Sequence, residues 1–306
     1  MILPLLALTL SLTQVEGAVR VPNHHLYPPT MHPSTRTAHR RMMASWKSPL
    51  PAAPTSPVIF PTQYGADPSG ATDSSPAFAE ALSALLSRAT GMNMSDNIKD
   101  LGGVVLDLQG GEYLLSQPLV IPQFVGNMRI IDGTLRAASN FPPAEYLLQV
   151  GASPCKTPSG QGSCNENIGM SGLTLDASHI ATGCLRIAST MGATLDASSA
   201  IFGFNKTGIL LQGGHETMIS ETWVAAYFWS SPMKENTDTV GILISGNDHF
   251  LNGVIVFSAK VGVQLNGAAN KVIDTHTWNQ ATGNGGIGIL NEESQNIFVG
   301  CYLDFT

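Results

Sequence analysis

A short pattern of a glycine, an alternating apolar run and a polar turn recurs in the second half of the chain. The copies are Gly208-Ile-Leu-Leu-Gln-Gly, Gly241-Ile-Leu-Ile-Ser-Gly, Gly262-Val-Gln-Leu-Asn-Gly and Gly286-Ile-Gly-Ile-Leu-Asn, at steps of 33, 21 and 24 residues. Repeats of this length with apolar residues at every second position are typical of stacked coils. The pattern predicts a parallel β-helix, because one coil cannot bury its own apolar face. The alternative, a β-sandwich of hairpins, would need shorter spacing between paired strands.

An amphipathic helix is predicted before the first coils. Its apolar face consists of Phe78, Leu82, Leu85 and Leu86, which lie on one side of a helix. Asp73 or Ser75 can cap its N-terminus. We expect this helix to cover the open N-terminal end of the stack, since an unpaired end is an aggregation edge. Apolar runs between Gly102 and Ile187 continue the stack, with a loop-rich insertion at 137–167.

The start of the chain differs from the coils. Residues 1–17 begin with an apolar run and end in small residues, which predicts a cleaved signal peptide. Residues 18–56 are rich in Pro, His and Arg and predict a disordered leader. The coils would then occupy 57–306 as one domain. The repeat pattern stops in mid-coil at Thr306, so we expect a chain truncated at its C-terminal end.

Composition limits the possible partners. Charged residues make up 12% of the chain, Gly accounts for 31 residues, and the formal net charge is −7. This charge argues against nucleic acid, and an anionic substrate would need a local basic cleft. No stretch after the signal peptide is long enough to predict a membrane helix. No metal ion or cofactor is predicted, and we expect a monomer.

Four cysteines and two glycosylation motifs fit an oxidising, extracellular compartment. Cys155 and Cys164 flank a short flexible segment that a disulfide could close. With Cys184 and Cys301, three pairings of two disulfides remain open. The glycosylation motifs begin at Asn93 and Asn205.

The opening of the predicted coils resembles a known superfamily. The matching residues are Tyr64-Gly65-Ala66-Asp67, Thr72-Asp73, Pro76-Ala77-Phe78, Gly102-Gly103-Val104 and Gly111-Glu112-Tyr113. They resemble the start of the right-handed β-helix in the pectate-lyase-like superfamily. Over roughly 58–306, the chain looks like the plant polygalacturonases of the QUARTET3 type, which act on pectin in pollen mother-cell walls. The resemblance implies a secreted cell-wall enzyme that hydrolyses the α-1,4-galacturonan of pectin by carboxylate acid/base catalysis.

The motifs of ordinary polygalacturonases are matched only in part. Those enzymes carry Asn-Thr-Asp, Asp-Asp, Gly-His-Gly and Arg-Ile-Lys on successive coils. Residues 236–238 read Asn-Thr-Asp, so the resemblance implies catalysis by Asp238 and substrate binding by Asn236. Counting from the repeat glycines puts Ala259-Lys260 where Asp-Asp is expected and Asn284 where the histidine is expected. Lys260 would bind a uronate carboxylate or pair with Asp238, and no Arg-Ile-Lys motif is present.

Two further groups of carboxylates are candidates, because hydrolysis of a glycosidic bond needs two carboxyl groups. In one, Asp274 and Asp304 would act as acid and base, His276 would tune them, and Trp278 would stack on a sugar ring. In the other, Asp248 would lie two coils from Glu293, in a column that His215 begins. Aspartates are also common at turns for backbone reasons, so a structural role stays open for each.

Three functions are compatible with these residues. A polygalacturonase-like hydrolase is the first. A non-catalytic pectin-binding β-helix is the second, which Ala259-Lys260 and Asn284 favour. A pectate lyase is the third; it would need a calcium-binding carboxylate cluster and a basic residue such as Lys260 or Lys271.

Overall fold

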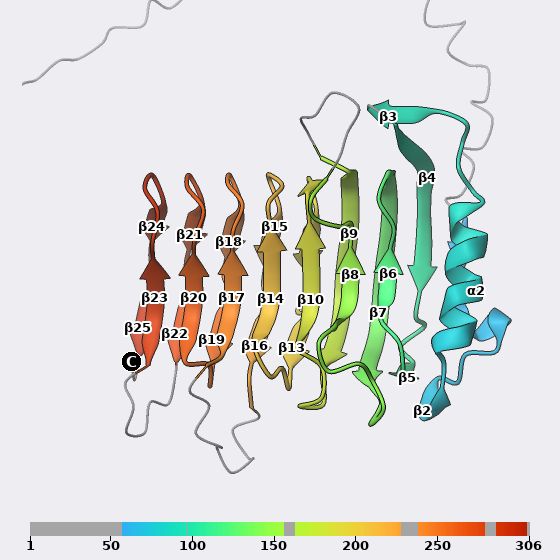
Figure 1. The fold of residues 1–306 in the computed structure, drawn as a ribbon, viewed down its shortest axis with the longest axis horizontal. Helices are drawn as coiled ribbons and strands as arrows, with labels where there is room; N and C mark the ends of the chain where they lie inside the picture. Colours follow the sequence, from blue (N-terminus) through green and yellow to red (C-terminus); the bar gives the residue numbers. More distant parts are fainter. Residues whose placement is uncertain (1–56, 96, 156–162, 228–237, 279–285, 305–306) are drawn as a thin grey trace, which may run out of the picture. The chain divides into compact units, whose positions relative to one another are not determined.

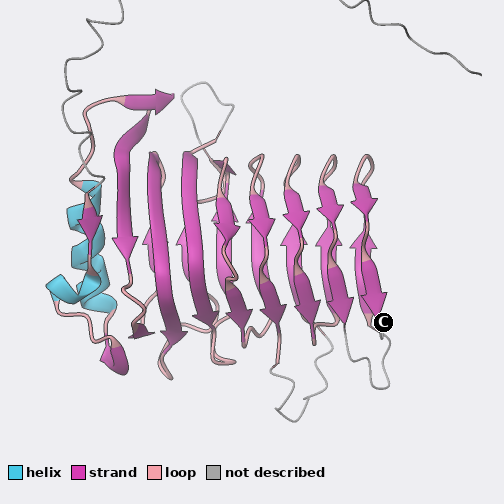
Figure 2. Cartoon of the chain, turned by 180° about the vertical axis from the view of Figure 1, so that it is seen from behind, coloured by secondary structure: helices cyan, strands magenta, loops and turns pink. Residues whose placement is uncertain are grey.

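The computed structural model describes residues 57–95, 97–155, 163–227, 238–278 and 286–304. These residues form a parallel β-helix, in which short strands stack along one axis into two curled sheets (Figure 1). Figure 2 shows the larger sheet from its outer side. The predicted fold class, an all-β right-handed parallel β-helix with a capping helix, is confirmed.

The smaller sheet contains one strand from each coil, and its strands pair in parallel. Its seven strands are β6 (Leu119–Ile121), β8 (Tyr146–Val150), β10 (Gly183–Ala188), β14 (Thr207–Gln212), β17 (Val240–Ile244), β20 (Val261–Leu265) and β23 (Ile287–Asn291).

The larger sheet has 18 strands, and its first coils carry long strands that later coils divide into two. The first part comprises β1 (Val58–Ile59), β2 (Ser69–Asp73), β3 (Asn93–Ser95), β4 (Ile98–Asp107), β5 (Glu112–Leu115), β7 (Val125–Ala137), β9 (Asn165–Asp176), β11 (Thr190–Met191), β12 (Thr194–Asp196) and β13 (Ala200–Phe202). The second part comprises β15 (Met218–Ser220), β16 (Trp223–Ala225), β18 (Phe250–Asn252), β19 (Ile255–Phe257), β21 (Lys271–Ile273), β22 (His276–Trp278), β24 (Ile297–Val299) and β25 (Tyr302–Asp304).

A bend with a left-handed residue separates the two larger-sheet strands of each later coil. The residues at this bend are Glu221, Gly253, Asp274 and Gly300, with φ of 48°, 63°, 46° and 64°. Gly and Asp tolerate this conformation better than most residues. The bend therefore gives Asp274 a backbone reason to be an aspartate.

The repeat glycines are required because adjacent coils approach closely. Gly208, Gly241, Gly262 and Gly288 align in the smaller sheet. A Cβ atom on Gly208, Gly241 or Gly262 would lie 2.7, 2.6 or 2.6 Å from the carbonyl oxygen of the next glycine in this column. The last member is Gly288 rather than the predicted Gly286, because strand β23 (Ile287–Asn291) begins later than the sequence pattern suggested.

The interior of the later coils is filled by one or two apolar residues from each strand. These side chains are buried, at 0% exposure, and include Ile219, Val224, Ile242, Ile244, Leu251, Val256, Val263, Leu265 and Val272. In the last described coil the corresponding Phe298 and Leu303 are 40% and 48% exposed. Burial in this fold therefore depends on a neighbouring coil at each position.

Helix α2 (Ser75–Leu86), preceded by the short η1 helix (Pro61–Tyr64), covers the N-terminal end of the stack (Figure 1). Phe78 and Leu85 are buried, and the Phe78 ring packs edge-on against Tyr113 at 5.1 Å. The position and apolar face of this helix agree with the prediction. Within the described residues, no helix has the length and hydrophobicity that crossing a bilayer requires.

The aspartates of the opening motif hold this cap in place. Asp73 accepts hydrogen bonds from the backbone and hydroxyl groups of Ser75 and Ser116, which joins the helix start to the end of β5. Burial acts to raise the pKa of Asp73, but these hydrogen bonds outweigh it and the pKa is lowered. Asp67 accepts four hydrogen bonds within its own turn. The motif that carries the resemblance is therefore structural.

The predicted loop-rich insertion at 137–167 contains strand β8, which pairs with β6 and β10. This segment therefore belongs to the stack and is not an insertion outside it. The prediction missed β8 because the run Leu147 to Val150 lacks the glycine that begins the later repeats. Cys155 and Cys164 form a disulfide beyond β8, with Cα atoms 5.7 Å apart. Cys184 is buried and unpaired, and Cys301 is half-buried and unpaired.

Candidate functional site

An exposed aromatic face covers the outer side of β16, β19, β22 and β25. The middle residue of β16, β19 and β22 is buried, and Leu303 holds the same position in β25, the last described coil. The flanking residues are exposed or half-buried, except Ala225, which is buried. The pairing of the strands aligns Trp223 with Ile255, His276 and Tyr302, and it aligns Phe257 with Trp278 and Asp304. We call Trp223, Phe257, His276, Trp278 and Tyr302 the aromatic face.

The rings of the aromatic face touch across neighbouring coils. Trp223 and Phe257 lie 6.1 Å apart in an edge-on arrangement, and Phe257 and Trp278 lie 6.4 Å apart. His276 and Tyr302 lie 4.7 Å apart. Trp223 is 49% exposed and Tyr302 is 59% exposed. Such a surface offers flat apolar area with polar edges, which suits the apolar face of a sugar ring.

The spacing of this face also suits a polymer. Coils stack at about 4.8 Å, which is similar to the length of one sugar residue in an extended polysaccharide. The sequence singled out His276 and Trp278, and the structure places both on the aromatic face. The sequence analysis missed Phe257 and Tyr302. Their only signal in the sequence is that each directly adjoins the inward-pointing middle residue of a short strand.

Charged residues lie at the edge of the same coils, where the larger sheet leads to the smaller one. Asp238 precedes β17, and its carboxylate lies 3.5 Å from the Lys206 ammonium group of the previous coil. Both side chains are well exposed, at 69% and 60%. The observed partner of Asp238 is therefore Lys206, which the sequence analysis overlooked because it lies more than 30 residues away.

Lys260 lies on the coil after Asp238. Its backbone N–H donates to the buried hydroxyl of Thr239, which joins the two coils at this edge. Only residues 258–260 connect β19 to β20, whereas residues 226–239 and 279–286 make the connections on either side. Lys260 therefore sits on the shortest of three successive connections, next to the aromatic face.

The two proposed partners Asp274 and Asp304 are not brought together. Asp304 aligns with Trp278, and the residue that aligns with Asp274 on the next coil is Gly300. Four positions of extended chain correspond to roughly 13 Å, which exceeds the separation of about 9.5 Å at which two carboxyl groups still act in inverting hydrolysis. Only Asp304 lies on the aromatic face.

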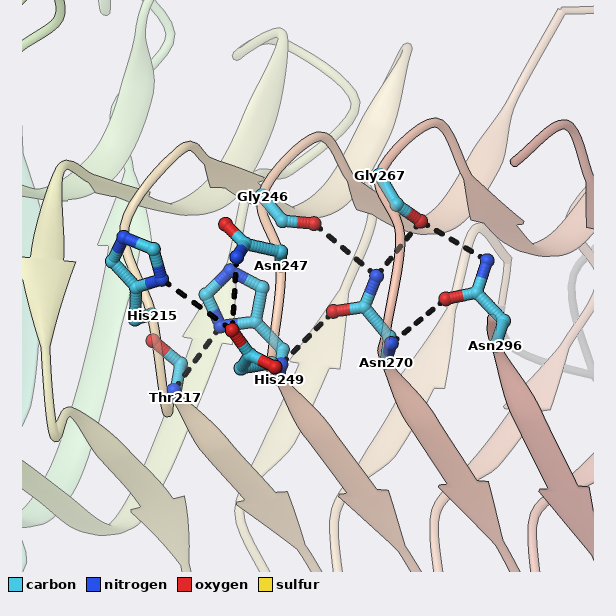
Figure 3. Close-up of polar contacts among 9 residues, drawn as sticks. His215, Thr217, Gly246, Asn247, His249, Gly267, Asn270 and Asn296 are labelled. Carbon is cyan, nitrogen blue, oxygen red and sulfur yellow. Dashed lines mark hydrogen bonds and ion pairs between the residues drawn. The ribbon is translucent and has the colours of Figure 1, made fainter. Parts of the chain in front are cut away.

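Asp248 lies at a different corner of the coil, in the turn between β17 and β18. Its carboxylate is 3.6 Å from His215 Nδ1 and 2.8 Å from the Asn247 amide (Figure 3). The left-handed residues of this turn are Glu216, Asp248, Ala269 and Gln295. The predicted column with His215 and Glu293 was wrong, because the turn after β14 holds an extra residue and the last glycine is Gly288.

A ladder of buried polar side chains runs beside this corner, as Figure 3 shows. The His249 N–H donates to the side-chain oxygen of Asn270, and the Asn270 N–H donates to the side-chain oxygen of Asn296. The Asn270 amide also donates to the carbonyl groups of Gly246 and Gly267. This ladder satisfies backbone groups that the turn would otherwise leave unpaired in the interior.

His249 takes the place of an asparagine in this ladder. Its Nδ1 accepts the N–H of Thr217 at 3.1 Å, as the asparagine oxygens do on the later coils. The ring is 1% exposed, and a side chain on Gly246 would collide with it. Burial lowers the pKa of His249 to about 4, and the neighbouring His215 adds to this effect, while the Gly213 carbonyl and Asp248 oppose it.

Acid should therefore destabilise the folded protein through His249. At pH above 6.5 the ring is neutral in both the folded and the unfolded state. As the pH falls from 6.5 to about 4, the unfolded chain takes up a proton that the folded chain does not, so the free energy of unfolding decreases. The loss approaches about 3 kcal/mol. Urea unfolding at several pH values should show this slope, and His249→Asn should reduce it.

His215→Asn is the matched control, because His215 is 43% exposed in the same turn. It should leave most of the pH dependence in place. An equal slope in the wild type and in His249→Asn would contradict the assignment.

The remaining predicted residues differ in what the structure says of them. Asn236 and Asn284 lie outside the described residues. Because the repeat glycine is Gly288, position 284 is no longer the expected equivalent of the histidine motif. Asn93 is exposed on β3. The Asn205 side-chain amide donates to the Ile180 carbonyl at 3.1 Å. Among the described residues, no three His, Cys, Asp or Glu side chains are grouped as metal ligands.

Comparison with known proteins finds the same fold in solved structures. No family model matches the sequence. ORF18 of Geobacillus virus E2 superposes with a TM-score of 0.61 at 12% identity, over 90% of this chain and 53% of that chain. Tailspike protein 2 of the Escherichia coli O157:H7 bacteriophage CAB120 gives a TM-score of 0.50 at 11% identity, over 82% and 39%. At these identities the likeness concerns the fold alone.

The stacked coils and these comparisons define a parallel β-helix protein, and its opening motif resembles that of the pectate-lyase-like superfamily. The chain is similar to Polygalacturonase QRT3 of Arabidopsis thaliana. The two are 34% identical over 278 residues, which is 87% of this chain and 56% of that protein. The chain therefore spans about half the length of this curated relative.

Proposed function

We propose that this chain carries the substrate-binding part of a secreted hydrolase that cleaves the α-1,4-galacturonan of pectin in the plant cell wall. The observation that carries the proposal is the aromatic face bordered by Asp238, Lys206 and Lys260, in a chain 34% identical to a polygalacturonase. Secretion rests on the predicted signal peptide at 1–17.

The roles of the residues follow from their chemistry. The aromatic face would hold successive sugar rings, and Lys206 and Lys260 would attract uronate carboxylates to a protein whose net charge is negative. Asp238 is the candidate acid or base. Asn205 and Ala259 take the equivalent positions on the neighbouring coils, so the second carboxyl group that hydrolysis requires must come from another column. Asp304, beside Trp278, is a further candidate.

A second function is favoured by one observation. Ala259 is buried and Lys260 follows it where ordinary polygalacturonases carry paired aspartates. A pectin-binding protein without turnover would retain the aromatic face and the lysines but not this pair.

One assay separates these functions. The protein is incubated with de-esterified polygalacturonate, and new reducing ends are recorded together with the ultraviolet absorbance of unsaturated products. We expect reducing ends without absorbance, since hydrolysis adds water and leaves no double bond. Both signals together would indicate a lyase. Neither signal, with polygalacturonate retained in a pull-down, would indicate the binding protein.

A further inference from the structure

A small polar pocket lies on the outer side of β7, β9 and β12, and the coil of β12 directly precedes the coil that carries Trp223 of the aromatic face. Its volume is 180 Å³, and its polar lining consists of Arg129, Ser171, Thr194 and Asp196. Strand pairing brings these residues together, because Arg129 and Thr194 both align with Gly169, and Ser171 aligns with Asp196. The pocket lies before the bend of the larger sheet, whereas the aromatic face lies after it.

Arg129 is the cation of this pocket, and its guanidinium group is available. It is exposed, and it forms no ion pair with any residue that the structure describes. Arg136, on the same strand, contrasts with it, since its guanidinium group is held by Glu112 and Asp176. The two arginines therefore have different roles, one structural and one open to solvent.

Gly169 makes room for the Arg129 side chain on the adjacent strand. A Cβ atom at position 169 would lie 3.2 Å from Arg129 Cγ and 3.7 Å from Arg129 Nε. The distance to Cγ is shorter than an ordinary van der Waals contact. The absence of a side chain lets the arginine lie across β9 toward the hydroxyl of Thr194. Gly169 has an ordinary strand conformation rather than a positive φ, so the space it leaves is the property that matters here.

The chemistry of the lining defines the ligand. A guanidinium group binds a carboxylate through two parallel hydrogen bonds. The hydroxyl groups of Ser171 and Thr194 and the carboxylate of Asp196 can bind ligand hydroxyl groups. Asp196 would repel a doubly charged phosphate more strongly than a sugar acid, whose single carboxylate can pair with Arg129 while its hydroxyl groups donate hydrogen bonds to Asp196. The volume is below the range of about 300–1,000 Å³ for drug-sized ligands, which suits one sugar unit.

We propose that this pocket is a second binding site for a single uronic acid unit, separate from the aromatic face. The choice of galacturonate as ligand rests on the proposed function. The site would hold another part of the same polymer, or a neighbouring polymer, and raise the effective concentration of substrate at the aromatic face. Its loss should therefore weaken the action on long polymers more than the action on short oligomers.

The test is an NMR titration with galacturonate, following the amide signals of Gly169 and Ser171. The full chain with Arg129→Gln is compared with Arg88→Gln, which removes the same charge from an exposed turn just after α2. We expect saturable shifts in the wild type and in Arg88→Gln, and at least tenfold weaker binding in Arg129→Gln. Galactose, which lacks the carboxylate, should bind as weakly as galacturonate binds to Arg129→Gln. Thr194→Val, which retains the charge, should weaken binding to a smaller extent.

Two outcomes would overturn the inference: equal binding by Arg129→Gln and wild type, or equal binding of galactose and galacturonate. The reducing-end assay distinguishes this failure from failure of the proposed function. Turnover of polygalacturonate without Arg129-dependent binding would refute the second site alone. Arg129-dependent binding without turnover would refute the hydrolase and leave the second site standing.

Discussion

Replacing Asp238 with asparagine should reduce kcat/KM for polygalacturonate by about 100-fold to 10,000-fold, the usual contribution of a general acid or base. An amide group cannot exchange a proton with the glycosidic oxygen or with water. The ion pair with Lys206 is well exposed, so its loss should change the free energy of unfolding by less than about 1 kcal/mol. Initial rates from reducing ends, together with thermal unfolding, measure both effects.

Glu80→Gln is the matched control for this prediction. It removes one carboxylate from an exposed position on α2, far from the aromatic face, and should retain the wild-type rate. If Asp238→Asn also keeps most of the wild-type activity, Asp238 serves only as a surface partner of Lys206. The search for the carboxyl groups would then move to Asp304.

Replacing Asn270 with alanine should lower the free energy of unfolding by about 3–5 kcal/mol. The side chain is fully buried and makes three hydrogen bonds to the backbone of its own and the previous coil. Alanine leaves the His249 N–H and two carbonyl groups without these partners, and each unsatisfied buried group costs about 1–3 kcal/mol. Equilibrium unfolding in urea would report the change as a lower midpoint.

Two variants sharpen this prediction. Asn252→Ala removes an exposed asparagine from β18 and should have little effect. Asn270→His should retain more stability than Asn270→Ala, because His249 already takes the corresponding place on the previous coil. A loss below about 1 kcal/mol in Asn270→Ala would mean that the ladder does not bind the coils together.

Sequence and structure agree on the general architecture for physical reasons that act locally. Alternating apolar residues predict strands with one inward face, and the repeat glycines mark places where coils touch backbone to backbone. The periodic apolar face of α2 predicts a helix without knowledge of its partner. The aspartates of the opening motif carry the resemblance to the pectate-lyase-like superfamily. In the structure, Asp67 and Asp73 accept hydrogen bonds near the capping helix.

The candidate site could be predicted only in part. Trp278, His276 and Asp238 were found because they lie close to a repeat or within a family motif. Phe257, Tyr302 and Lys206 were missed, although each contacts or adjoins one of those residues on a neighbouring coil. Conversely, Asp274 and Asp304 were predicted to be partners from their positions in the sequence, but the strand register separates them along the coil.

Periodicity within one coil is enough to predict that the chain folds into stacked coils, where a helix covers them, and which residues point inward. It does not predict which outward residues become neighbours, because that depends on pairing between coils. Connections between coils vary in length, so the register is set by the pairing of strands and by buried polar ladders such as His249 to Asn296. When the pairing register of a strand shifts by one or two residues, as at Gly288, each outward residue gains different neighbours on the adjacent coil. The register therefore decides which side chains make up a site on this surface.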